Sequence, residues 1–320
     1  FLGQVETDTG NLRSALEWIA GHGTVEAGLA LAQGLGLVAI HRGHMADALH
    51  WLDHFIAAHG PKPVDLHTRS LVVRGWVRLA LGREQDGLAD ANEALALTED
   101  DNPMAMAHAL NLRGFAARTP GDLEAALGMV GKLPDGAIMA AQTLMGLSLL
   151  ATTVDGDTPR ATAYLEEAIS LLGPGPTVGH SIMLGNLASL VLDGGGLPRA
   201  ADLRRQSLLL DIQGRALRSL VIDLGSASEI GLAAGRATEA ARLFGAEEAL
   251  RERIGVVVEW FNQEFQDEHL QSLTAALGED RFTSAMAEGR ALSLEDALDE
   301  ALLLLDEVAD SPARSASRSP

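Results

Sequence analysis

The sequence predicts an all-α solenoid: a superhelical stack of antiparallel helix pairs, with no sheet. Three observations support this prediction. Short glycine-centred turns recur at intervals close to 39 residues, with their glycines at positions 43, 82, 121, 156, 196 and 235. Small residues stand at fixed offsets on both sides of these glycines. The chain shows no sustained alternation of apolar and polar residues and no Asn-Gly turn, which would indicate strands.

The small residues explain how such helix pairs would pack. Small side chains at facing positions let two antiparallel helices approach closely, and the turn glycine is expected to supply the left-handed residue that ends the first helix. Five residues after each glycine stand Ala48, Gly87, Ala126, Ala161, Ala201 and Ala240. Seven residues before each glycine stand Gly36, Gly75, Gly114, Leu149, Ser189 and Ser228, and among these only Leu149 is large.

Helix starts are marked by capping residues. Asn102, Thr119 and Thr158 each precede a proline, which suits the first position of a helix. Ser293 and Asp296 have the spacing of a capping box. With the apolar periodicity, these signals predict helix pairs over residues 24–58, 64–97, 103–133, 136–172, 177–212 and 215–253, and a further helical segment over 259–308.

Composition excludes several classes of protein. The chain has 320 residues, of which 47% are hydrophobic and 21% charged, so it can bury a core and exceeds one ordinary domain. Its net charge of −20 repels phosphate backbones, so we expect no direct binding to nucleic acid. The absence of cysteine excludes disulfides and thiol catalysis and favours a cytoplasmic location. No apolar run is long enough to span a membrane. Both ends suggest that the chain is cut from a longer protein.

The spacing of small residues resembles the tetratricopeptide repeat. A small residue in the first helix and an alanine in the second stand 12 positions apart over about residues 24–253. The repeats here are longer than the usual 34 residues, and the aromatic positions of the consensus are mostly replaced. The resemblance is therefore to a divergent form with long helices.

Three motifs resemble the C-terminal helical region of the large ATP-binding LuxR-type (STAND-class) transcriptional regulators of bacteria. They are "NLRSALEWI" at Asn11–Ile19, "AARLFGAEEALRERIG" at Ala240–Gly255 and "LGEDRFTSAMAEGRALSLEDALDEAL" at Leu277–Leu302. In such proteins an ATPase module usually precedes this region, and a DNA-binding helix-turn-helix often follows it. Some relatives carry a nucleotide cyclase at the N-terminus instead, and the sequence leaves that alternative open. This chain contains no GxxxxGK[ST] phosphate loop.

The resemblance implies a domain organisation. Residues 1–23 would form an opening helix after an ATPase module that this sequence lacks, and residues 24–258 would form the tetratricopeptide-like repeats. Residues 259–308 would form C-terminal capping helices, and residues 309–320 a flexible linker. Within the cap, the side chains expected to pack are Arg281, Phe282, Met286 and Leu292.

The function implied is that of a non-enzymatic sensor or interaction region. A small-molecule effector or a partner protein or peptide would bind in the concave groove and act allosterically on the ATPase and DNA-binding modules of the full-length protein. The alternative is a passive protein–protein scaffold or a self-association module, including a homo-oligomer. No catalytic motif is present, so we expect no enzymatic activity and no cofactor.

Aligning each repeat with the tetratricopeptide pattern at its small residue predicts which side chains of the first helices face the groove. They form an apolar strip with a few hydrogen-bonding groups, which suits a small molecule or a peptide, although the same side chains would also serve simple packing. Val72, Met183 and Ile222 belong to this strip. The candidate ligand-binding residues are Arg69, Trp76, His108, Asn111, Phe115, Thr143, Asn186 and Glu229.

Two arginines occupy equivalent places one repeat apart. Arg74 and Arg113 are candidate anion contacts, because stacked guanidinium groups can hold a carboxylate or phosphate. Pairing with Asp or Glu of neighbouring helices is the favoured interpretation, since buried arginines are usually paired.

A histidine-rich segment raises the question of a metal site. His41, His44, His50, His54 and His59 lie within it, and His50 and His54 have the i, i+4 spacing that can hold Zn²⁺. These two histidines fall opposite the apolar face of the predicted helix, and no HExxH motif is present. A solvated helix face is the favoured interpretation, and no metal is predicted.

Overall fold

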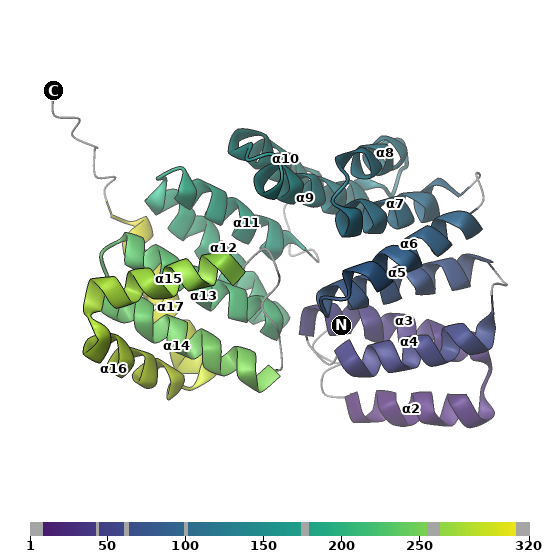
Figure 1. The fold of residues 1–320 in the computed structure, drawn as a ribbon, viewed down its shortest axis with the longest axis horizontal. Coiled ribbons are helices and arrows are strands. Elements are labelled where there is room, and N and C mark those ends of the chain that lie inside the picture. The colour runs from purple at the N-terminus through teal and green to yellow at the C-terminus, as the bar shows by residue number, and fades with distance from the viewer. Residues whose placement is uncertain are drawn as a thin grey trace. The chain divides into compact units, whose positions relative to one another are not determined.

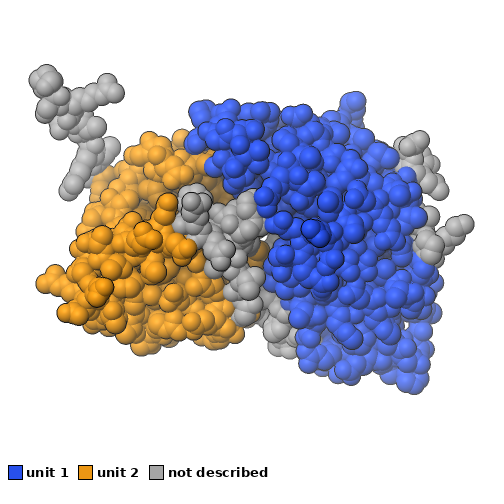
Figure 2. All heavy atoms as spheres, in the orientation of Figure 1, with its two compact units in different colours: residues 1–175 blue, residues 176–320 orange. Residues whose placement is uncertain are grey.

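The computed structural model describes residues 9–42, 45–60, 64–98, 102–173, 179–254 and 263–311. Within these residues all regular structure is helical, with sixteen α-helices and no strand (Figure 1). The predicted all-α fold is confirmed. The chain divides into two compact units, residues 1–175 and residues 176–320, which are described separately (Figure 2).

Unit 1 consists of one helix followed by four antiparallel pairs. The single helix is α2 (Thr9–His22). The boundaries of the pairs agree with those expected from the sequence to within a few residues. The pairs are α3 (Val25–Arg42) with α4 (Met45–His59), α5 (Val64–Ala80) with α6 (Glu84–Leu97), α7 (Pro103–Ala117) with α8 (Pro120–Val130), and α9 (Ala137–Thr153) with α10 (Thr158–Leu172).

Unit 2 continues the pattern with two pairs and then departs from it. The pairs are α11 (His180–Asp193) with α12 (Leu197–Gly214), and α13 (Leu217–Ala233) with α14 (Ala237–Ile254). The helical segment expected over 259–308 forms three helices: α15 (Gln263–Leu277), α16 (Glu279–Arg290) and α17 (Leu294–Ala309). Helix α16 packs along α14, and α17 packs against α12 and α13.

The small residues lie at the helix crossings, as expected. A Cβ built at Gly75 would overlap the side chain of Leu112, and one at Gly87 would lie 3.1 Å from the carbonyl oxygen of Gly75. Ser228 donates its hydroxyl hydrogen to the carbonyl oxygen of Ala240, at 2.7 Å. The alanines in the facing positions, Ala48, Ala126, Ala161, Ala201 and Ala240, are fully buried.

The fourth pair departs from the expected register by one residue. The hydroxyl of Ser148, not the side chain of Leu149, meets the second helix, and it donates to the carbonyl oxygen of Ala161 at 2.9 Å. Ser148 is buried, whereas Leu149 is half-buried. The turn between α9 and α10 spans residues 154–157, one residue more than the turn over 81–83 between α5 and α6. The longer turn accounts for the shift.

The turn glycines have the expected conformation at three positions. Gly82, Gly156 and Gly235 have φ angles of 72°, 67° and 81°, a region that only glycine enters without strain. Gly43 lies outside the described residues.

At two other turns a neighbouring residue takes this role. Gly121 lies inside α8, and Arg118 adopts the left-handed conformation, with φ 56°, at the end of α7. At the end of α11 the left-handed residue is Gly195, with φ 79°, and not Gly196.

Two of the expected helix caps are present. The Asn102 side chain accepts a hydrogen bond from the backbone N–H of Ala105 at 3.1 Å. The Ser293 hydroxyl accepts one from the N–H of Asp296, also at 3.1 Å. Each satisfies a backbone donor that the first turn of a helix leaves free.

Two other caps differ from expectation. Asp157, not Thr158, caps α10 by accepting from the N–H of Arg160 at 3.0 Å, and Thr158 is already helical. The Thr119 hydroxyl does not cap the backbone of α8 but donates to the carboxylate of Asp122 at 3.1 Å.

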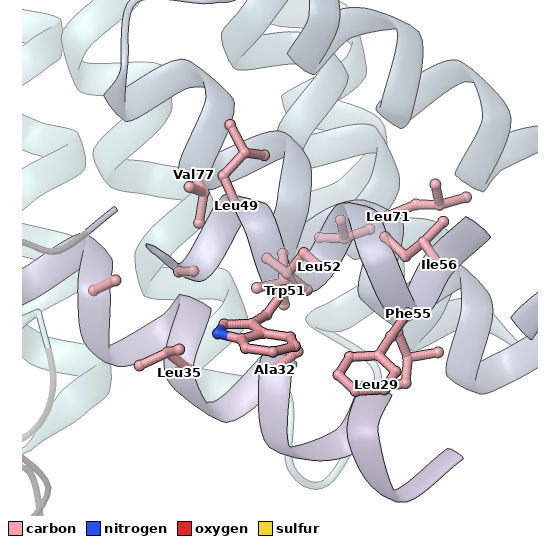
Figure 3. Close-up of a cluster of buried hydrophobic side chains, with 14 of the residues drawn as sticks. Leu29, Ala32, Leu35, Leu49, Trp51, Leu52, Phe55, Ile56, Leu71 and Val77 are labelled. Atoms are coloured by element: carbon pink, nitrogen blue, oxygen red, sulfur yellow. The ribbon is translucent and has the colours of Figure 1, made fainter. Parts of the chain in front are cut away.

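One core cluster of unit 1 gathers buried side chains of α3, α4 and α5 (Figure 3). Leu52 and Leu71 are fully buried there, and the rings of Trp51 and Phe55 stack with centroids 5.9 Å apart. Gly28 gives the Phe55 ring its space, because a Cβ at this position would overlap the ring. Burying each such side chain stabilises the fold by roughly 1.5–3 kcal/mol.

In unit 2, helices α14 and α16 approach each other closely. A Cβ at Gly245 would overlap the carbonyl oxygen of Met286, and one at Gly289 would overlap that of Arg242. The two backbones therefore touch, and only glycine fits at these points. No side-chain pattern in the sequence had marked this crossing.

The side chains expected to pack the C-terminal helices do so with one exception. Phe282 and Met286 pack against the core between α14 and α16, and Leu292 packs against the core formed by α17. Arg281 is exposed, so its expected packing role is wrong. Helices α15–α17 thus bury apolar side chains against the last repeat pair. None of the described helices is long and apolar enough to cross a membrane.

Candidate functional site

A row of apolar side chains follows the first helices of the four pairs in unit 1. Helices α3, α5, α7 and α9 succeed one another, each in contact with the next. Directly after the small residue at its crossing, each helix carries a large apolar side chain. We define the apolar row as these four residues: Leu37, Trp76, Phe115 and Leu149.

The centre of the apolar row is an aromatic pair. The rings of Trp76 and Phe115 have centroids 5.3 Å apart and planes tilted by 58°. Both side chains are half-buried, and Leu37 is 53% exposed. Large apolar side chains that are partly open to solvent at equivalent positions make this row a candidate contact surface.

Buried polar links join the first helices one turn before the apolar row. Gln33, four residues before Leu37, donates from Nε2 to the Ser70 hydroxyl at 2.6 Å. Asn111, four residues before Phe115, donates from Nδ2 to the Thr143 hydroxyl at 3.3 Å. Asn111 is 4% exposed and Thr143 is fully buried, so the structure places both of these candidate ligand contacts in the interior.

Two further candidates, Arg69 and His108, lie near each other one repeat apart. Arg69 is exposed and His108 is half-buried. Burial lowers the pKa of His108, and the positive charge of Arg69 lowers it further. His108 is therefore neutral near pH 7, with an imidazole that can donate or accept a hydrogen bond.

Arg74 belongs to a partly buried ion-pair network. Its Nη2 lies 2.6 Å from Asp90 Oδ1 and its Nη1 lies 3.0 Å from Asp53 Oδ1. Arg78 contacts the same two carboxylates, at 2.7 and 3.1 Å. Burial raises the pKa of Asp90, although the two arginines favour its charged form. The guanidinium of Arg74 thus joins α4, α5 and α6.

Arg113 is paired in the same manner. Its Nε and Nη2 donate to the two oxygens of Asp122 at 2.7 and 2.6 Å, a bidentate pair that lowers the pKa of this carboxyl. Both candidate anion contacts therefore have carboxylate partners within the protein.

The remaining candidates lie in unit 2. Asn186 on α11 is exposed, and Glu229 on α13 is partly buried, with a pKa raised by burial. Ile222, also on α13, is 41% exposed, whereas Met183 is fully buried. The expected strip is divided between the two units, and the aromatic part of it belongs to unit 1.

Sequence reasoning missed a buried polar group in unit 2. Arg204, Ser207 and Asp211 lie on the buried face of α12, where they are 3%, 1% and 5% exposed. Their spacing of three and four residues puts them on one stripe, which was a detectable signal. Gly185 provides space for the guanidinium, because a Cβ there would lie 2.6 Å from Arg204 Nη1.

The histidine-rich segment shows no metal site in the part of it that the structure describes. His50 and His54 are exposed and both contact the ring of Trp51 edge-on, at centroid distances of 5.0 and 5.9 Å. No group of three His, Asp or Glu side chains with metal-binding geometry occurs among the described residues. His44 lies outside these residues, and the side chain of His41 is not described.

Comparison with known proteins identifies the fold. No family model matches the chain, and no curated protein matches it. Among solved structures, a tetratricopeptide repeat protein from Parabacteroides merdae is similar with a TM-score of 0.50 and 19% identity, over 84% of this chain and 94% of that one. The chain therefore has a tetratricopeptide-like helix-pair solenoid fold.

Two other solved structures are more distant. PilF of Pseudomonas aeruginosa gives a TM-score of 0.40 at 19% identity, over 76% of this chain and 99% of that one. A chain of the APC/C hetero-tetramer Cut9–Hcn1 gives 0.43 at 12% identity, over 88% of this chain and 60% of that one.

Proposed function

We propose that this chain is a non-enzymatic binding region whose apolar row takes up an extended apolar segment of a protein partner. The half-exposed pair of Trp76 and Phe115 is the observation that supports this most strongly. Interfaces take most of their binding energy from a few such aromatic anchors. Leu37 and Leu149 extend the surface by one repeat on each side, which suits an extended peptide more than a compact ligand.

In the longer protein, this binding is proposed to regulate other modules. The three motifs that resemble the LuxR-type ATP-binding regulators support this context. A partner that binds one arrangement of the repeats better than another would bias the ATPase and DNA-binding modules by the difference in affinity. A small-molecule effector on the same surface and a passive scaffold are the competing proposals.

A peptide-display selection on the isolated chain tests the proposal. Peptides selected against the wild type are expected to carry apolar side chains at spaced positions. Their affinity should fall by about 1–3 kcal/mol on Trp76→Ala or Phe115→Ala, the range of a buried aromatic anchor. Trp18→Ala is the matched control, because Trp18 is 61% exposed and lies on α2, outside the apolar row.

The outcomes separate the proposals. Peptides that bind Trp76→Ala and the wild type equally would contradict the assignment of the surface. The small-molecule effector would be favoured if no peptide is selected and a thermal-shift screen finds small molecules that stabilise the wild type but not Trp76→Ala. If partners bind but the ATPase activity of a full-length protein that contains the ATPase module does not change, the result would favour a passive scaffold.

A further inference from the structure

The polar group on the buried face of α12 joins three helices of unit 2. From Arg204, Nη1 donates to Asp223 Oδ1 on α13 at 2.9 Å. Its Nη2 donates to the carbonyl oxygen of Gly185 at 2.7 Å and to the Ser189 hydroxyl at 3.2 Å, both on α11. A single guanidinium thus connects α11, α12 and α13.

Two carboxyl groups share this site with the one guanidinium. The Ser181 hydroxyl donates to Asp211 Oδ1 at 2.7 Å. The Ser207 hydroxyl lies 2.9 Å from the carbonyl oxygen of Ser181 and 3.1 Å from Asp223 Oδ1. The two carboxyls are within hydrogen-bonding reach of each other, and such a bond requires a proton on one of them.

The charges at this site do not balance when both carboxyls are ionised. Asp211 and Asp223 are 5% and 1% exposed, and the buried Asp223 Oδ2 has no hydrogen-bond partner among the described residues. Two buried carboxylates beside one guanidinium would leave an uncompensated negative charge away from water. A proton retained between them removes that charge.

We propose that Asp211 and Asp223 form a shared-proton pair that holds α11, α12 and α13 together and loosens them when the proton is lost at alkaline pH. Burial, together with the neighbouring charge of Asp223, raises the pKa of Asp211 to about 8. Burial also raises the pKa of Asp223, against the opposing effect of Arg204. The pair therefore releases one proton in the mildly alkaline range.

Further charged groups lie on the helices packed around Asp211 and Asp223. Arg205 of α12 pairs with Asp202 and with Asp306 of α17, both exposed. Other titratable or charged groups on these helices include His180 and Asp193 on α11, Arg199 and Arg215 at the two ends of α12, Arg218 and Glu229 on α13, and Glu295, Asp296, Asp299, Glu300 and Glu307 on α17, of which Glu307 pairs with Arg236. Burial raises the pKa of Glu229, and the charge of Arg204 opposes this shift.

The sign of the pH effect follows from the raised pKa. Between the ordinary aspartate value near 4 and about 8, folded unit 2 holds a proton that the unfolded chain has released. The contribution of the pair to stability is therefore full at acid pH. It falls as the pH rises through this window, and is lost above about pH 8.

Hydrogen exchange of the full chain tests the pair. In Asp211→Asn the amide donates permanently to Asp223, so this variant should not respond to the loss of the proton. Comparing variant and wild type at the same pH cancels the intrinsic change in exchange rate. From pH 6 to 8, amides of residues 180–223 in the wild type should lose protection relative to the variant, by about tenfold per pH unit. Peptides of α5 should show no such difference.

Two controls sharpen the test. Asp202→Asn changes an exposed aspartate on the same helix and should follow the wild type. All variants are also made in a background with Glu229→Gln and Glu247→Gln, because burial raises the pKa of both carboxyls, that of Glu247 to about 7, and their titration would otherwise overlap with that of the pair.

The proposal fails if wild type and Asp211→Asn lose protection in parallel. Should the variant not fold, carbon-13 NMR of wild-type protein labelled at the aspartate carboxyls decides the question. A carboxyl signal that titrates with a midpoint near 8 supports the pair, and the absence of any aspartate titrating above pH 7 overturns it.

Discussion

His269 shows how burial of one side chain sets its chemistry. It is 8% exposed on α15, with Nε2 2.7 Å from the Ser228 hydroxyl and its ring edge-on to Phe244. Burial lowers the pKa of His269 to about 4. Between pH 4 and the ordinary value of 6.5, the unfolded chain therefore binds a proton that the folded chain does not, and stability falls as the pH falls.

This residue gives the first prediction. His269→Gln keeps a hydrogen-bonding side chain but does not titrate. Between pH 6.5 and 4.5 the wild type should lose about 2 kcal/mol more unfolding free energy than the variant does. Urea unfolding of both proteins at the two pH values measures this difference. His50→Gln, on an exposed side chain, should behave like the wild type, and equal losses in all three proteins would refute the role of His269.

Residues whose partners are local could be predicted from the sequence, and those with remote partners could not. Asn102 and Ser293 cap their helices because both donor and acceptor lie within four residues. Arg204 on α12 and Asp223 on α13 meet across 19 positions of sequence, which no local pattern specifies. The inward position of Thr143 depends on the one-residue shift of α9, which only the packing reveals.

At the scale of helices, the crossing of α14 and α16 is the most sensitive contact. Gly289→Ala should destabilise the protein by roughly 3 kcal/mol, at the upper end for overpacking, because its Cβ meets a backbone carbonyl that cannot move aside as a side chain can. Gly128→Ala is the control, since a Cβ there meets nothing and alanine favours the helix by about 0.5–1 kcal/mol. Thermal unfolding that ranks Gly289→Ala at or above Gly128→Ala would contradict the close crossing.

The pairing of α7 with α8 gives a second prediction at this scale. Ala126 is fully buried at the crossing, so Ala126→Leu should destabilise by roughly 1–3 kcal/mol through overpacking. Its neighbour Ala125 is exposed on the same helix, and Ala125→Leu should change stability by less than about 0.5 kcal/mol. Chemical denaturation of both variants measures the contrast. Equal effects would mean that the face of α8 is wrongly assigned.

The helix pairs themselves were predictable because their signals repeat. Turn residues, caps and small residues recur with a nearly constant interval, so a weak signal in one repeat can be located from the signals in its neighbours. The register within a pair is less secure, since one extra residue in the turn before α10 moves every side chain of α9 by 100°. The positions of the helices could therefore be predicted more accurately than the direction in which each side chain points.

For the whole molecule, net charge is the property that decides which partners are accessible. With a formal charge of −20, the chain repels phosphate backbones, at physiological salt within a Debye length of about 8 Å. We predict no retardation of duplex DNA by this chain at physiological salt in a gel-shift assay. Retardation that persists as the salt concentration rises would indicate a DNA-binding surface that the charge does not reveal.

The candidate site was predicted in part at this scale. The aromatic pair of Trp76 and Phe115 was expected on one surface, and the structure brings the two rings together because both follow a glycine at a helix crossing. Two of the polar candidates, Asn111 and Thr143, face neighbouring helices and not solvent, because side-chain orientation within a helix decides which of the two a polar group meets. Whether the surface binds a partner stays a prediction.

The place of α17 has a consequence for the order in which the chain forms during synthesis. The principal contacts of unit 1 join helices that are neighbours or next neighbours in the sequence, so its core can assemble as the chain leaves the ribosome. Unit 2 differs, because α17 supplies Ala301, Leu304 and Leu305 to a core that begins with α12. Until those residues have been translated and released, the apolar faces of α12 and α13 lack this cover, so we expect a growing chain at that stage to expose apolar surface of the kind that favours aggregation.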